Sequence, residues 1–126
     1  MGYDITKKDK GGIIHFIGNA MSVKEIDNAK NELYCDAEFD SYKYLVLNFT
    51  DACFSTLTEQ RLDESAAIDA AEARSVPGIT IIIVVKEPHA ADLFQYYAEK
   101  SRVFASTWKF IIADSISRWK VQERKN

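Results

Sequence analysis

The sequence has few cysteines, and none has the spacing of a redox or zinc motif. Cys35 and Cys53 are the only two in the chain. A disulfide framework needs several cysteines at regular intervals, and a zinc site needs closely spaced cysteine or histidine ligands. We therefore predict neither of these features and expect both thiols to be reduced.

Long apolar runs and glycine-rich loops are also missing. No run approaches the ~20 apolar residues of a membrane helix, so no membrane span is predicted. No phosphate-binding loop, dinucleotide fingerprint or metal-ligand spacing occurs, so no cofactor and no metal are implied. Residues 1–12 lack the apolar core of a secretory signal, and we expect a cytoplasmic protein.

Charge of one sign is not concentrated either. The chain has 16 Lys and Arg against 19 Asp and Glu. Its bases are scattered and do not form a stripe with stacking aromatics, which does not favour a nucleic-acid partner.

The most informative feature that the sequence does have is a β-branched run over residues 79–85. It lies between Pro77-Gly78 and Lys86-Glu87-Pro88 and is apolar on both of its faces. A strand of this kind must be covered on both faces, and helical patterns flank it in the chain. The run therefore predicts a central strand of an α/β sheet with crossover helices.

The remaining elements follow from hydrophobic periodicity and capping signals. Strands are predicted at 3–6, 13–17, 44–49, 79–85 and 109–113, and helices at 22–37, 56–74, 88–102 and from Asp114 onward. Two capping boxes, Ser22 to Glu25 and Thr56 to Glu59, would open the first two helices. We predict one domain over residues 1–126 in the order ββαβαβαβα, with a frayed tail from about residue 122.

Several side chains have an expected environment. The 56–74 helix would present an acidic outer face that includes Asp69. His15 is expected to be a packed or hydrogen-bonded core residue. Tyr96 and Trp108 have no obvious inward position, so they could leave an apolar surface for a homodimer or a ligand.

The order of elements and the hydrophobic pattern from Gly12 onward resemble the SpoIIAA-like STAS domain family. The similar features are the Leu45 to Phe49 strand leading into a hydroxyl-capped acidic helix, the 79–85 strand and the closing Phe110-Ile111-Ile112 strand before Asp114. The resemblance implies a mixed, mostly parallel sheet of about five strands. It also implies a non-enzymatic module that binds or regulates another protein.

In the anti-sigma-antagonist members of that family, a hydroxyl in an Asp-Ser-Ser-Gly-like motif is phosphorylated by a partner kinase. The corresponding stretch here follows Asp51 and reads Ser55-Thr56-Leu57-Thr58-Glu59, with Thr58 nearest to the phosphorylated position. The sequence departs from the motif because Glu59 stands where the motif has Gly. We expect Thr56 or Thr58 to act as a helix cap.

A second group of polar residues follows the predicted strands. Ligands in open α/β sheets bind beyond the carboxyl ends of the strands, and this edge would collect Cys53, Lys86, His89 and Asp114. His89 is expected to be a solvent-facing residue of a first helical turn. Cys53 could act as a nucleophile only beside a base that lowers its pKa.

Three functions follow from these observations. The first is a STAS-like regulatory module whose partner is another protein, with a homodimer as one arrangement. An alternative is a carrier or sensor of a small hydrophobic ligand. A second alternative is a small thiol-dependent enzyme that uses Cys53.

Overall fold

The computed structural model describes residues 2–104 and 107–115, without the side chains of Ser55 and Thr56. Its strands are β1 (Gly2–Lys8), β2 (Gly11–Ser22), β3 (Tyr44–Thr56), β4 (Thr80–Val84) and β5 (Lys109–Ala113). Its helices are α1 (Val23–Tyr34), α2 (Glu59–Ser75) and α3 (Pro88–Val103), with a short 3-10 turn at Phe39–Ser41. The predicted final helix lies outside the described residues.

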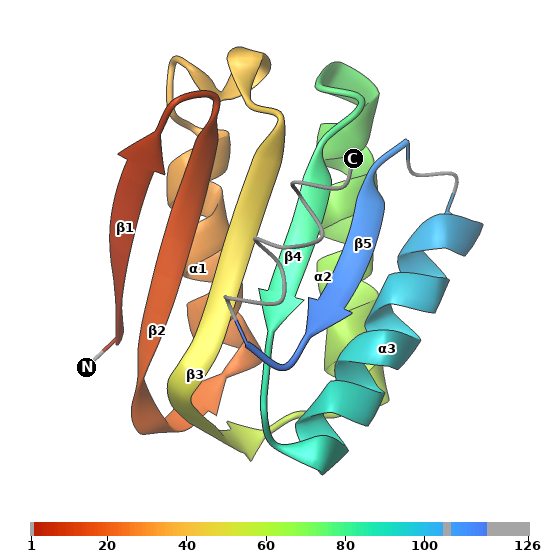
Figure 1. The fold of residues 1–126 in the computed structure, drawn as a ribbon. Helices are drawn as coiled ribbons and strands as arrows, with labels where there is room; N and C mark the ends of the chain where they lie inside the picture. The colour runs from red at the N-terminus through yellow and green to blue at the C-terminus, as the bar shows by residue number, and fades with distance from the viewer. Residues whose placement is uncertain (1, 105–106, 116–126) are drawn as a thin grey trace.

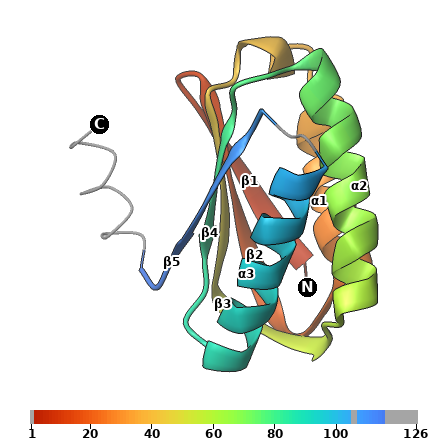
Figure 2. The ribbon, with the colours of Figure 1, turned by 90° about the vertical axis from the view of Figure 1, so that its right-hand side faces the viewer.

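The strands form one mixed sheet in the order β1-β2-β3-β4-β5 (Figure 1). β1 is antiparallel to β2, and all other neighbours are parallel. Because the strand order runs in one direction, successive right-handed crossovers pass over the same face of the sheet. Figure 2 shows the result: α1, α2 and α3 form a single layer on one side. The predicted α/β class and mixed, mostly parallel sheet are confirmed.

The central strand is buried on both faces, as its sequence predicts. Ile81 and Ile83 point to the helical layer, and Ile82 and Val84 belong to a smaller apolar cluster on the other face. This second cluster is completed by β3 and β5 residues, namely Val46 and Ala113. Among the described residues, no helix lies on that second face.

The strands β2 and β3 are much longer than the predicted ones. They pair with each other as far as Ser22 and Thr56, through register shifts after His15, Gly18 and Met21. Gly18 has φ 151°, a conformation that glycine adopts more readily than other residues. The stretch after Phe49, which we expected to be a loop, is therefore a strand because β2 supplies a partner for it.

Trp108 and Tyr96, the two aromatic residues without an obvious inward position in the sequence, both form hydrogen bonds. Trp108 is buried, and its Nε1 donates to the Val76 carbonyl oxygen at 2.6 Å. The Tyr96 hydroxyl donates to Asp63 at 2.8 Å. The expectation of an apolar surface is therefore wrong for Trp108, whereas Tyr96 is half-buried. The exposed large apolar side chains of the described chain are Ile17, Val103 and Phe104.

Candidate functional site

The carboxyl end of β3 projects beyond its neighbour in the sheet. β3 pairs with β4 only over Tyr44–Asn48, whereas it continues along β2 to Thr56. The Asn48 side chain accepts hydrogen bonds from the Thr50 backbone N–H at 3.1 Å and hydroxyl at 2.6 Å. Local bonds of this kind compete with sheet pairing. Beyond Asn48, one side of β3 is therefore not covered by β4.

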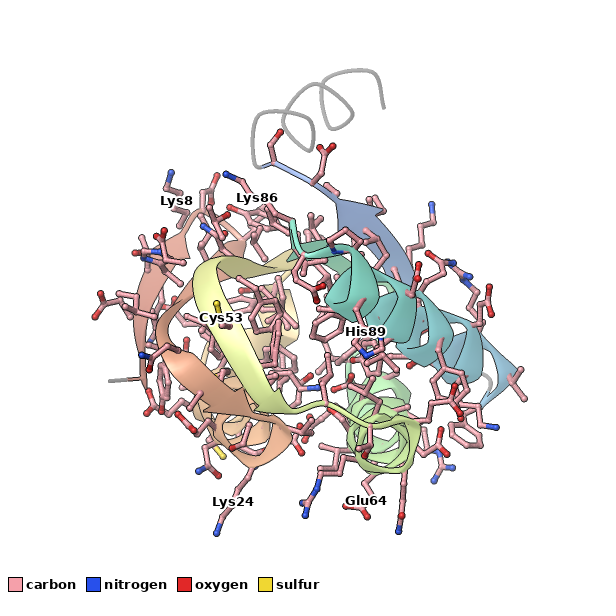
Figure 3. The ribbon with its side chains drawn as sticks, turned by 90° about the horizontal axis from the view of Figure 1, so that it is seen from below. Lys8, Lys24, Cys53, Glu64, Lys86 and His89 are labelled. Carbon is pink, nitrogen blue, oxygen red and sulfur yellow. The ribbon has the colours of Figure 1, made fainter. Side chains whose placement is uncertain are left out.

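A pocket of about 340 Å³ lies between this projecting end of β3 and the start of α3. Its lining comes from the end of β3 and the segment after it, and from the N-cap and first turn of α3: Cys53, Phe54, Leu57, Glu87, His89 and Ala90. Figure 3 looks onto this end of the molecule, with Cys53 on β3 and His89 on the first turn of α3. Its size is at the lower end of the range for small-molecule sites.

The inner wall of the pocket belongs to an aromatic cluster. The ring of Phe54 packs against Phe49 and Phe94, with centroid distances of 5.3 and 5.6 Å. Phe49 is in turn stacked on Phe16 at 4.5 Å and on Phe94 at 5.0 Å. Phe54 is half-buried, whereas the other three rings are buried. These ring contacts position Phe54 so that its ring forms an apolar wall of the pocket.

The acidic group of the pocket also has a structural role. The two carboxylate oxygens of Glu87 accept hydrogen bonds from the His89 and Ala90 backbone N–H groups, at 2.9 and 2.6 Å. Glu87 is thus the N-cap of α3, where Pro88 fits because it has no N–H to satisfy. The bond from His89 N–H, followed by that from Ala90, lowers the pKa of Glu87. Its carboxylate therefore stays ionised at neutral pH.

The structure brings together two of the residues that the sequence placed at the strand ends, Cys53 and His89. Both side chains are exposed, and neither makes a hydrogen bond to another described residue. A nucleophilic pair would need a thiol and a base within hydrogen-bond reach. The described residues also contain no group of three or more His, Cys, Asp or Glu side chains that could hold a metal ion.

The other strand-end residues do not line the pocket. Lys86 is exposed and projects on the helix-free side of the sheet, away from Cys53 and His89 (Figure 3). Asp114 is exposed and follows the end of β5. The sheet has no reversal of strand order, so it lacks the crevice that gathers such residues in doubly wound folds.

The hydroxyl stretch before α2 has a simple local role. Thr58 is the N-cap of α2, and its hydroxyl oxygen accepts from the Arg61 backbone N–H at 3.3 Å. The expectation of a cap at Thr58 is confirmed, but the predicted capping box from Thr56 is wrong because Thr56 is the last residue of β3. Glu59 is exposed in the first turn, where an acid favours the helix dipole. The side chains of Ser55 and Thr56 lie outside the described structure.

Asp51 is hydrogen-bonded to His15 of the neighbouring strand β2. Its Oδ2 lies 2.7 Å from His15 Nε2, and the side chains are 60% and 36% exposed. His15 is therefore hydrogen-bonded, as expected, but it is not a core residue, because it lies on the helix-free face of β2.

A buried polar cluster lies between the three helices, and the sequence patterns did not lead us to predict it. The Lys30 ammonium group lies 3.0 Å from Asp69 Oδ1 and donates to Ser65 Oγ at 2.7 Å. Asp69 also accepts hydrogen bonds from the hydroxyls of Tyr34, at 2.5 Å, and Tyr97. Lys30 is 2% exposed and Asp69 is 1% exposed. The prediction that Asp69 lies on the outer face of α2 is therefore wrong.

The cluster could have been found from helical spacing. Asp69 follows the buried Leu62 by seven residues and Ala66 by three, which puts it on the inward face of α2. Burial raises the pKa of Asp69, although the Lys30 charge acts in the opposite direction. Burial also raises the pKa of Tyr34 well above its usual value. The cluster ties α1, α2 and α3 together and does not reach solvent.

Comparisons with protein-family models, with curated proteins and with solved structures give no match for this chain. No helix in the described ranges has the length and apolar character needed to cross a membrane.

Proposed function

We propose that the protein is a non-catalytic binding module that resembles a STAS domain and binds its partner at the carboxyl edge of the sheet. The observation that carries this proposal is the projecting end of β3. It presents the exposed residues Asp51 and Cys53 and leads to Thr58 and Glu59 at the start of α2. The end of this strand is paired with β2 on one side only and runs into a helix start, so it offers an ordered surface to another protein.

The partner in this proposal is another protein, and reversal of one exposed charge tests it. Glu59→Lys changes the first turn of α2, and Glu64→Lys is the matched control on an exposed position of the same helix. The partner is first identified by mass spectrometry of complexes from the protein's own cells. Glu59→Lys should weaken its binding at least about tenfold, which corresponds to 1.4 kcal/mol. Equal binding by both variants would contradict the proposed surface.

A second candidate function is a sensor or carrier of a small ligand, and the 340 Å³ pocket favours it. Apolar lining with a few polar groups is the usual composition of such sites. The ligand would occupy the same edge of the sheet, between β3 and α3. It should therefore protect Cys53 from alkylation without protecting Cys35, which lies at the far end of α1.

The thiol-enzyme alternative is tested by the same chemistry. A thiol enzyme requires at least a thiol and a base in the same site. Cys53 and His89 line one pocket and meet this minimum requirement. An activated thiol reacts as the thiolate. If Cys53 reacts with iodoacetamide no faster than Cys35, the binding module is favoured. A far faster reaction at neutral pH would favour the enzyme.

A further inference from the structure

The pocket between β3 and α3 combines an aromatic wall with an ionised acid. Phe54, Leu57 and Ala90 supply the apolar surface, and Glu87 supplies the negative charge. The carboxylate of Glu87 already accepts two backbone N–H groups. A carboxylate has about four acceptor positions on its two oxygens, so further positions remain for a donor.

The charges around the pocket favour a positively charged occupant. His89 is the only basic residue among those that line it. The other exposed acids of the two helix starts are Glu59, in the first turn of α2, and Asp92, three residues beyond His89 on α3. The neighbouring base Lys86 projects on the opposite side of the sheet (Figure 3). In the pocket lining, a ligand with a negative charge would meet the Glu87 carboxylate and one imidazole.

From these features we propose that the pocket binds a small organic amine in its ammonium form, with its hydrocarbon body against Phe54 and Leu57 and its charge next to Glu87. An aromatic ring attracts a cation through its negative face, and a carboxylate pairs with it directly. The pocket volume of about 340 Å³ restricts the body to a single ring or a short chain. The inference rests on the small-ligand form of the proposed function.

Three probes of matched shape test the charge preference: benzylamine, benzyl alcohol and benzoate. Each is titrated into the full chain while the backbone amide signals of Phe54, Leu57 and Ala90 are followed by NMR. Benzylamine should bind about tenfold more tightly than benzyl alcohol, because a partly exposed ion pair and a cation–π contact together are of that order. Benzoate should bind most weakly.

Two variants identify the groups responsible. Glu87→Gln keeps an oxygen that can cap α3 but removes the charge, so the advantage of benzylamine over benzyl alcohol should disappear. Asp92→Asn removes an exposed charge of the same helix outside the pocket lining and should keep that advantage. Phe54→Leu should reduce the advantage while the carboxylate remains, and circular dichroism checks that each variant is folded.

The outcomes separate this inference from the proposed function. Equal binding of all three probes, or tighter binding of benzoate, would overturn the proposal that the ligand is an amine, but the pocket would remain a binding site. The absence of any shift at the three amides would overturn the ligand inference itself. Partner binding by the Glu59→Lys and Glu64→Lys variants is measured separately. The proposal of a protein partner is therefore tested independently of the amine titrations.

Discussion

Lys30 is the residue on which the packing of the three helices depends most. It comes from α1, but its ammonium group is bonded to Ser65 and Asp69 of α2 and lies 5.4 Å from the centre of the Tyr97 ring of α3. A buried charge is tolerated only when its partners replace water. The polar groups of this cluster all have hydrogen-bond partners, since no buried side-chain nitrogen or oxygen of the described residues lacks one.

We predict that Lys30→Met destabilises the protein by about 3 to 5 kcal/mol, because it leaves Asp69 buried without a cation. Lys24→Met is the control, since Lys24 is exposed on the same helix and its removal should change stability by less than about 0.5 kcal/mol. Urea unfolding measures both values. The double variant Lys30→Met with Asp69→Leu should recover most of the loss; a double variant as unstable as Lys30→Met would contradict this account.

Tyr34 of the same cluster makes the stability of the protein depend on pH in the alkaline range. Burial, and then the charge of Asp69, raise the pKa of Tyr34 well above the usual value. Since the pKa of Tyr34 is higher in the folded state than in the unfolded state, the stability that its protonated hydroxyl contributes is fully present below about pH 10. It is lost as the pH rises through the folded-state pKa. Tyr34→Phe should therefore show a shallower loss of unfolding free energy above that pH than the wild type; an unchanged slope would count against it.

At the scale of elements, local signals predicted where helices begin more reliably than where strands end. Ser22 caps α1 as its capping box predicts, with its hydroxyl accepting from the Glu25 N–H at 3.3 Å. The end of β3 could not be predicted in the same way. Phe49 is followed by the polar residues Thr50 and Asp51, and the stretch is extended because β2 pairs with it. Pairing between distant segments leaves no signal in either segment alone.

The cap of α2 provides a prediction at this scale. Thr58→Ala should lower stability by about 1 kcal/mol, because the Arg61 N–H loses its acceptor. Thr58→Ser keeps the hydroxyl and should be close to the wild type. Thermal unfolding of both variants measures the difference. If Thr58→Ala were as stable as Thr58→Ser, the hydroxyl would have a role other than capping.

For the molecule as a whole, the strand order determines where a site can form. Because β2 to β5 follow one another without reversal, the helices share one face and no switch point opens between them. The unequal length of β3 and β4 creates both features of this edge that we assign to binding, namely the projecting end of β3 and the pocket next to α3. The fold class could be predicted from hydrophobic patterns, but this pocket depends on strand lengths that could not.

Native mass spectrometry of the protein isolated from its own cells tests most directly whether binding takes place at this edge. Three forms are compared: the wild type, Cys53→Trp, which fills the pocket, and Cys35→Trp, which changes the other exposed cysteine. The account predicts a noncovalent adduct, either a partner protein or a small molecule, on the wild type and on Cys35→Trp but not on Cys53→Trp. An adduct that Cys53→Trp retains in full would contradict it.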